Sequence, residues 1–271
     1  MRFVHLTDPH LTPDGKSLYG INPLERFNKA IRDINRECAD AEFMVITGDL
    51  VHGGKISGYK ALRSALNQLH CPYYLVIGNH DNRNNLRKVF PELPIDNNGF
   101  VQYVIETNGS VLIILDTQIE GSHSGTLCKK RLDWLQKTVD YYSKTNVFLF
   151  MHHPPFRLPT KNELRNVISL APVKHLFFGH LHRPLHGVWA GLAFSCMRAT
   201  NHQIARDLGR TSSTPIGCLE PPGYAIVRFE DDLVIVHEQN FLDDNIWFEL
   251  RDPKARTAQT ISELKARKLD R

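Results

Sequence analysis

Short runs of apolar residues recur along the chain, and five of them stop abruptly at polar residues. These runs cover residues 3–6, 43–47, 74–77, 147–151 and 175–178. Their length and composition are typical of strands buried in a sheet. Between the first three runs, apolar residues recur at the three- and four-residue spacing of amphipathic helices. The alternation of strand and helix predicts a mostly parallel sheet with both faces covered.

The helices have recognisable starts and buried faces. Asn22 can accept a hydrogen bond from a free backbone N–H, and Pro23 suits the first helical position, so a helix is expected to begin there. A second helix is expected to be capped by Ser57. A third helix is expected between the apolar runs 111–115 and 147–151. The predicted buried stripes are Leu24, Phe27, Ile31, Ile34 and Cys38, then Tyr59, Leu62, Leu66 and Leu69, then Leu132, Leu135, Val139 and Tyr142.

A second, partly antiparallel sheet is expected to start near residue 100. Apolar and polar residues alternate from Val101 to Ile105, Asn108-Gly109 follows, and an apolar run covers residues 111–115. Asn-Gly between two such runs is a strong hairpin signal. Another hairpin is expected from residues 224–229 and 233–237. We predict a catalytic domain over residues 1–240 and a C-terminal arm over 241–271, with a helix from about Thr257 and a role in self-association.

Charge and composition limit the partners. Residues 251–271 hold seven Lys or Arg and three Asp or Glu, so they account for the whole net charge of +4. A neutral body is a poor match for duplex nucleic acid, and no nucleic-acid partner is expected. No apolar run approaches the roughly 20 residues that span a bilayer, so no membrane partner is expected. Five scattered cysteines without a CxxC pair favour reduced thiols and a cytoplasmic location.

The polar residues at the strand ends are of the kinds that bind metal ions. Parallel strands bring their carboxyl ends to one edge of a sheet, so these residues should gather there. Asp, His and Asn suit Mn, Fe, Zn or Co, and no cysteine joins them. Asp49 should follow a central strand and bridge two ions, because two cations need an anion between them. The segments are Asp8-Pro9-His10, Gly48-Asp49, Gly78-Asn79-His80-Asp81, His152-His153 and Gly179-His180-Leu181-His182.

In this order the segments resemble the calcineurin-like metallophosphoesterase superfamily. They match its D-x-H, G-D, G-N-H-[DE], H-H and G-H-x-H motifs over about two thirds of the chain. The GNHD and HHPP segments look like class III cyclic-nucleotide phosphodiesterases and metal-dependent glycerophosphodiesterases, and Leu18-Tyr19-Gly20 favours the latter. The resemblance implies an α/β fold, a four-layer α/β/β/α sandwich of two mixed sheets.

The resemblance also implies a dinuclear phosphoric diester hydrolase, in which water activated by two divalent or trivalent ions attacks phosphorus. His80 would donate a proton or hydrogen bond to the leaving oxygen, and Asp81 would orient His80. One ion would be held by Asp8, His10, Asp49 and His182, and the other by Asp49, Asn79, His152 and His180.

Contacts to the substrate are expected from Asn79 and His80, and three further residues are candidates. Arg83 could hold a phosphate oxygen or remain solvated. His52 stands where purple acid phosphatases have a tyrosine ligand, and could contact substrate, line the rim or act as a ligand. His202 could return to the pocket from the segment 200–203. The substrate would be a cyclic nucleotide or a glycerophosphodiester; the alternatives are a phosphomonoesterase and a metal-free scaffold.

Overall fold

The first of two large sheets carries three of the strands that lead to polar segments. The structure is a computed structural model that describes residues 1–169, 171–206, 214–242 and 248–265. The strand order of this first sheet is β13-β12-β1-β2-β3. β1 pairs in parallel with β2, and β2 with β3, whereas β12 and β13 are antiparallel. The expected place of the Asp49 strand, β2, between the strands that lead to Asp8 and Asn79 is confirmed. The strands are β1 (Arg2–Leu6), β2 (Phe43–Thr47), β3 (Tyr73–Val76), β12 (Gly223–Glu230) and β13 (Leu233–Asn240).

The second sheet has the order β4-β5-β6-β7-β9-β8. Its β4–β5 hairpin and the β12–β13 hairpin confirm both predicted hairpins. Of the two residues in the first turn, only Gly109 has a positive φ, 80°. The strands are β4 (Tyr103–Thr107), β5 (Ser110–Ile114), β6 (Asn146–Phe150), β7 (Val173–Phe178), β8 (Leu185–Trp189) and β9 (Leu192–Cys196).

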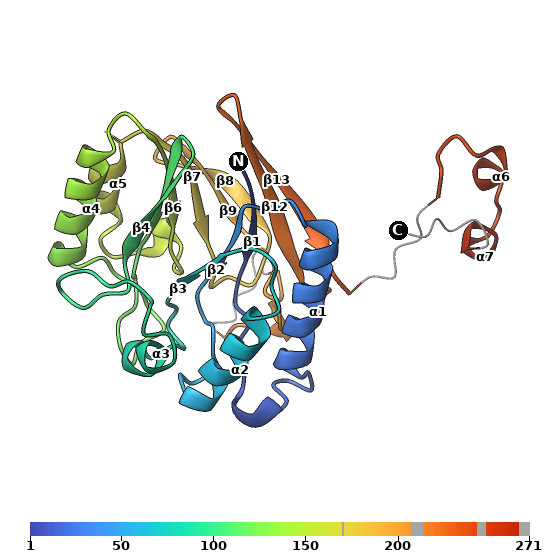
Figure 1. Cartoon of the computed structure of the whole chain (residues 1–271), viewed down its shortest axis with the longest axis horizontal. Helices are drawn as coiled ribbons and strands as arrows, with labels where there is room; N and C mark the ends of the chain where they lie inside the picture. Colours follow the sequence, from blue (N-terminus) through green and yellow to red (C-terminus); the bar gives the residue numbers. More distant parts are fainter. Residues whose placement is uncertain (170, 207–213, 243–247, 266–271) are drawn as a thin grey trace. The chain divides into compact units, whose positions relative to one another are not determined.

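Helices cover the outer faces of both sheets, as Figure 1 shows. The predicted four-layer sandwich is therefore confirmed. Phe3 of β1 packs edge-on against Phe148, Phe150 and Phe177 of the second sheet, which joins the two sheets through a buried aromatic core. The helices of this part are α1 (Pro23–Glu37), α2 (Ile56–Leu66), α3 (Arg83–Val89), α4 (Lys129–Tyr141) and α5 (Lys161–Ile168), with short 3-10 turns at Pro13–Gly15 and Pro155–Arg157.

The starts of α1 and α2 differ in how well they were predicted. Asn22 accepts hydrogen bonds from the backbone N–H groups of Leu24 and Glu25, at 3.1 and 3.3 Å, which confirms it as the cap of α1. The expected cap at Ser57 is wrong. The chain is still extended at Lys55 and already helical at Ile56, so Ser57 lies inside the first turn.

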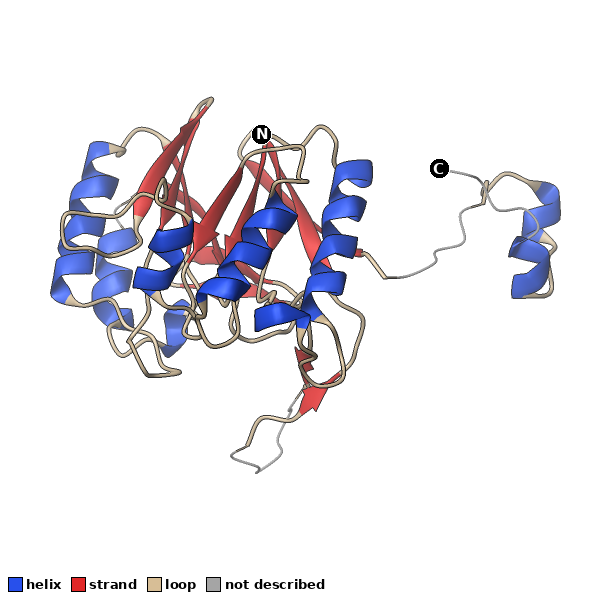
Figure 2. Ribbon diagram, turned by 60° about the horizontal axis from the view of Figure 1, so that its bottom comes forward, coloured by secondary structure: helices blue, strands red, loops and turns tan. Residues whose placement is uncertain are grey.

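Beyond the two sheets, the chain forms small elements. Strands β10 (Gln203–Ile204) and β11 (Gly217–Cys218) form a ribbon apart from the main sheets, visible in Figure 2. Residues 242–271 form a separate unit with α6 (Pro253–Arg256) and α7 (Ile261–Lys265). The helix expected from about Thr257 begins four residues later. Among the described residues, no helix has the length and apolarity needed to cross a membrane.

Candidate metal centre

The polar segments that follow β1, β2 and β7 share an unusual backbone. Asp8, His10, Asp49, His180 and His182 have φ values between 47° and 69°. Residues other than glycine rarely adopt this left-handed conformation, which costs about 1–2 kcal/mol each. Such strain concentrates at functional sites, where the surrounding structure maintains it. All five were predicted as metal ligands from the sequence, so the strain falls where chemistry is expected.

The first set of ligand atoms comes from Asp8, His10, Asp49 and His182, all buried. Nε2 of His182 lies 3.3 Å from Oδ1 of Asp8 and 3.1 Å from Nε2 of His10. Nε2 of His10 lies 3.5 Å from Oδ2 of Asp49. Two imidazole lone pairs that face each other beside two carboxylates suit a shared cation. The structure thus brings together the four residues predicted for one ion.

The second set comes from Asp49, Asn79, His152 and His180. Oδ1 of Asn79 lies 3.0 Å from both Nε2 of His152 and Nδ1 of His180, and these two nitrogens are 3.3 Å apart. Oδ2 of Asp49 lies 3.4 Å from Nε2 of His152. The same carboxylate oxygen therefore reaches both sets, as a bridging ligand must. The chemistry of both donor sets fits divalent ions of the Mn, Fe, Zn or Co kind.

Several bonds around these side chains select which atoms face the centre. Nδ1 of His152 donates to the carbonyl of Thr47, and Nδ1 of His182 to the carbonyl of His202, both at 2.8 Å. The lone pair on each Nε2 is therefore left for a metal. Oδ2 of Asp8 accepts from the Thr7 hydroxyl at 2.6 Å, which leaves Oδ1 toward His182.

Two glycines let the segments approach closely. A Cβ atom on Gly78 would lie 2.2 Å from the backbone nitrogen of Asp49, and one on Gly179 would lie 2.0 Å from the Thr7 hydroxyl oxygen. Both contacts are shorter than real Cβ atoms allow. Glycine at these two positions is therefore what allows the segments to pack so closely.

The buried carboxylates need positive charge around them. Burial alone would raise the pKa of Asp49, but His152 and His10 hold it well below its ordinary value. Although burial disfavours the cation, Asp49 raises the pKa of His152 to about 9. By contrast, burial and His152 lower the pKa of His180 to about 3. Metal ions at this centre would displace the proton from His152, so binding should strengthen as pH rises.

The expected role of Asp81 in orienting His80 is wrong. Its buried carboxylate accepts from the backbone N–H groups of Gly78, Leu50 and Val51, at 2.9, 3.1 and 3.1 Å. The hydroxyl of Tyr59 donates a fourth bond at 3.0 Å. Burial and the nearby Asp49 raise the pKa of Asp81 to about 7, whereas these N–H donors lower it. Asp81 therefore ties together the loops that follow β2 and β3.

Arg83 neither faces the site of a phosphate oxygen nor remains solvated, so both expectations for it are wrong. Its guanidinium forms a paired contact with Asp116 at 2.7 and 2.8 Å and donates to the carbonyl of Gln118 at 2.9 Å. Asp116 is fully buried and also contacts Arg131. Arg83 thus neutralises a buried carboxylate and does not line the cavity beside the metal centre.

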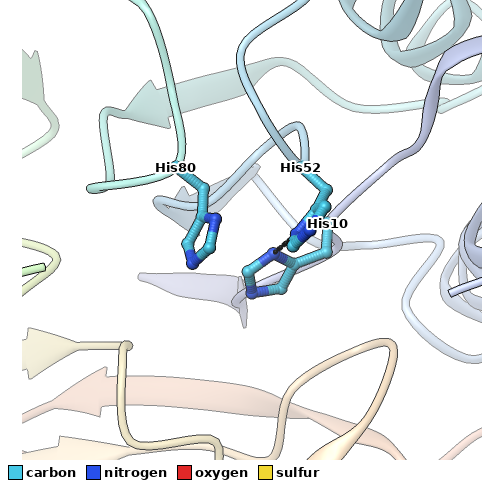
Figure 3. Close-up of side chains that lie close together, drawn as sticks. All are labelled: His10, His52 and His80. Atoms are coloured by element: carbon cyan, nitrogen blue, oxygen red, sulfur yellow. Dashed lines mark hydrogen bonds between the residues drawn. The ribbon is translucent and has the colours of Figure 1, made fainter. Parts of the chain in front are cut away.

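That cavity has a volume of about 880 Å³. His52, His80 and His202 line it, as does His123. The rings of His10, His52 and His80 lie close together in Figure 3, with centroids between 4.8 and 5.5 Å apart. Further side chains complete the wall and rim of the cavity, most of them between residues 157 and 219. The wall and rim residues are Tyr19, Arg157, Leu181, Ile204, Pro215, Gly217, Cys218 and Leu219.

Known proteins are similar to this chain in sequence and in fold. The family model for calcineurin-like phosphoesterases matches residues 1–184. A probable cyclic nucleotide phosphodiesterase of Rhodopseudomonas palustris is 39% identical, over 94% of this chain and 98% of that protein. A probable glycerophosphodiester phosphodiesterase of Arcobacter nitrofigilis is 28% identical, over 82% of this chain and 86% of that protein.

Among solved structures, a dimetal phosphatase from Danio rerio has the same fold at 14% identity. Its TM-score is 0.68, with 89% of this chain and 96% of that chain covered. The family match spans all the metal-binding segments, from Asp8 to His182. The chain therefore belongs to the calcineurin-like phosphoesterase family.

Proposed function

We propose that this protein is a metal-dependent phosphodiesterase that hydrolyses small phosphodiesters. The observation that carries the proposal is the position of Oδ2 of Asp49, within 3.5 Å of a ligand nitrogen from each of two donor sets. Both sets face a cavity large enough for a nucleotide-sized molecule. Asp8, His10, Asp49 and His182 would hold one ion, and Asp49, Asn79, His152 and His180 the other. Two such ions supply charge neutralisation at the phosphate and a water of lowered pKa.

We assign to His80 the role of donor to the leaving oxygen. Its backbone N–H donates to Oδ1 of Asp49 at 2.8 Å, which fixes it beside the metal centre. Its ring lines the cavity, and burial lowers its pKa, so the imidazole is neutral at pH 7. A neutral imidazole can donate a hydrogen bond from its N–H to the leaving alkoxide, which stabilises the charge that develops as the bond to phosphorus breaks.

The charge of the cavity supports a diester over a monoester. Among the described residues that line it, Arg157 is the only Lys or Arg. A diester carries one negative charge, whereas a monoester dianion is better bound by additional cations. A single exposed arginine at the rim therefore matches the diester.

Of the two diester classes, the cavity favours a cyclic nucleotide. Tyr19, Leu181, Ile204 and Leu219 give it an apolar wall that can cover a nucleobase, whereas a glycerol headgroup offers little apolar surface. The relative with 39% identity also bears the name of a cyclic nucleotide phosphodiesterase. A cytoplasmic location, self-association through the C-terminal part, and the absence of nucleic-acid partners stay predictions.

The test is a substrate panel at one fixed Mn²⁺ concentration. It contains cyclic AMP, glycerophosphocholine, glycerophosphoethanolamine, bis-nitrophenyl phosphate and nitrophenyl phosphate, with Asp49→Asn as the control for contaminating activity. We expect kcat/KM for the diesters to exceed that for nitrophenyl phosphate, with cyclic AMP the best natural substrate. A preference for nitrophenyl phosphate would make the enzyme a phosphomonoesterase.

A further inference from the structure

His10 differs from His152 and His182 in what holds its second ring nitrogen. His152 and His182 donate from Nδ1 to backbone carbonyls. Nδ1 of His10 instead faces Nδ1 of His52 across 3.4 Å, the dashed contact in Figure 3. A carbonyl can only accept a hydrogen bond, but an imidazole nitrogen accepts or donates according to its tautomer. The state of His52 and the orientation of His10 are therefore coupled.

The direction of that bond follows from the metal centre. Nε2 of His10 lies among the first set of ligand atoms, so a bound metal takes its lone pair. The proton of neutral His10 must then be on Nδ1, where it faces His52. Nδ1 of His52 must accept it, and His52 must carry its own proton on Nε2.

The surroundings of His52 leave that second proton available. His52 is half-buried and lines the cavity, and its ring stacks on His80 with centroids 4.8 Å apart and planes 22° apart. Within the described part of the chain, the ring of His52 forms its hydrogen bond through Nδ1 alone. Nε2–H is thus the polar group that His52 offers to a molecule in the cavity, next to the group assigned to the leaving oxygen.

We propose that His52 is a positioning residue that accepts the Nδ1–H of His10, and that metal binding at His10 thereby sets His52 as an Nε2–H donor toward the substrate. The inference rests on the proposed metal-binding role of His10. It assigns to His52 a function that neither a metal ligand nor an inert rim residue would have. The expected acceptor is a phosphoryl oxygen of the diester, since this is the anionic group that the metal centre must hold.

Substitutions at His52 can separate its two nitrogens. Asn places its amide oxygen near the position of Nδ1, whereas Gln places its amide nitrogen near Nε2. His52→Asn should therefore keep the bond to His10, and His52→Gln should lose it while remaining polar. His52→Phe keeps a flat ring without either nitrogen. Because His52 is half-buried at a cavity wall, none of these changes removes a core side chain.

The experiment titrates the metal-free full chain with Zn²⁺ by calorimetry. Partners of ligand histidines typically change metal affinity 10–100-fold, so we expect at least about a tenfold weaker Kd for His52→Gln and His52→Phe. His52→Asn should stay within about threefold of the unsubstituted protein. Equal affinity for all three variants would overturn the proposal, and so would equal weakening of all three.

A second readout observes the tautomers directly. In the Zn²⁺-loaded protein, ¹⁵N NMR of the histidine rings should show His10 protonated on Nδ1 and His52 on Nε2. A proton on Nδ1 of His52 would overturn the inference. His10→Ala tests the underlying assignment: if it binds Zn²⁺ as tightly as the unsubstituted protein, the metal site itself is wrong. Loss of Zn²⁺ in His10→Ala with no effect at His52 would reject only the role of His52.

Discussion

The hydroxyl of Tyr59 donates a hydrogen bond to the carboxylate of Asp81 across 3.0 Å, and both side chains are buried. The same hydroxyl accepts the backbone N–H of Asn82 at 2.8 Å. Helix α2, which carries Tyr59, thus supports the turn that presents Asn79 and His80. The position of these two residues depends on a side chain that touches neither metal nor substrate.

Tyr59→Phe should therefore destabilise the fold. It removes one of the four donors to Asp81 and leaves the part-buried N–H of Asn82 without its acceptor, which costs about 1–3 kcal/mol. Urea unfolding measures the loss. Tyr141→Phe is the matched control, because Tyr141 is 80% exposed and should change the free energy of unfolding little. An unchanged urea midpoint in Tyr59→Phe would show that the turn does not depend on this hydroxyl.

The metal-binding residues could be predicted because their information is local. Each follows directly on a buried apolar strand, and parallel strands bring such ends to one edge. The order of the strands β1, β2 and β3 then makes Asp49 central. The packing of the two sheets, which brings the ends of β6 and β7 against those of β1, β2 and β3, is the part that these local signals do not supply.

The contacts of Asp81 and Arg83, and the positions of the cavity-wall residues, depend on parts of the chain that are distant in sequence. Asp81 stands next to His80 in the sequence, but buried N–H groups of another loop take up its carboxylate. Arg83 pairs with Asp116, 33 residues away, and nothing in the sequence marks that aspartate as buried. Ile204 and Leu219 lie in a segment whose pattern does not indicate which of its side chains face the cavity.

Asn79→Ala should weaken the second metal set without destroying the first. Its Oδ1 lies 3.0 Å from ligand atoms of His152 and His180, whereas Asp8, His10 and His182 make no use of it. We expect the Mn²⁺ concentration for half-maximal activity to rise about tenfold or more, with activity restored at high Mn²⁺. An activity loss that no Mn²⁺ concentration reverses would remove Asn79 from the ligands.

His80→Ala should slow substrates according to their leaving groups. An alkoxide leaving group depends on the hydrogen bond from His80, and loss of one donor to a developing oxyanion costs about 10²–10³-fold, whereas nitrophenolate leaves without that help. We expect kcat for cyclic AMP to fall far more than kcat for bis-nitrophenyl phosphate, with bound metal unchanged. Equal slowing of both substrates would exclude His80 as the donor to the leaving oxygen.

Arg83→Met should affect stability and leave substrate binding unchanged. It removes one of the two cations that contact the fully buried Asp116. Leaving a buried charge without any partner costs about 3–5 kcal/mol, and because Arg131 remains, we expect a loss below about 3 kcal/mol. The free energy of unfolding and KM for a diester should be measured together. Arg87→Met, on the exposed side of α3, is the matched control. A higher KM at unchanged stability would restore a substrate-binding role for Arg83.

His175 gives the fold a pH dependence of its own. It is buried between the sheets and its Nε2 contacts the Ser195 hydroxyl at 2.9 Å. Burial, assisted by His186, lowers its pKa from 6.5 to about 4. As pH falls below 6.5, the unfolded chain binds a proton that the folded chain still excludes. Stability is therefore lost between pH 6.5 and 4, by about 3 kcal/mol from this group, and no further below.

His175→Gln tests this because an amide can keep the contact with Ser195 but does not titrate. The difference in unfolding free energy between pH 7 and pH 5 should be about 2 kcal/mol smaller in the variant, at saturating Mn²⁺. Since the metal centre is unchanged, its own pH dependence cancels in the comparison. His70→Gln, at an exposed position, should keep the full difference. If His175→Gln also keeps the full difference, the acid sensitivity must come from other buried histidines. His5 is the next to substitute, because burial lowers its pKa to about 3.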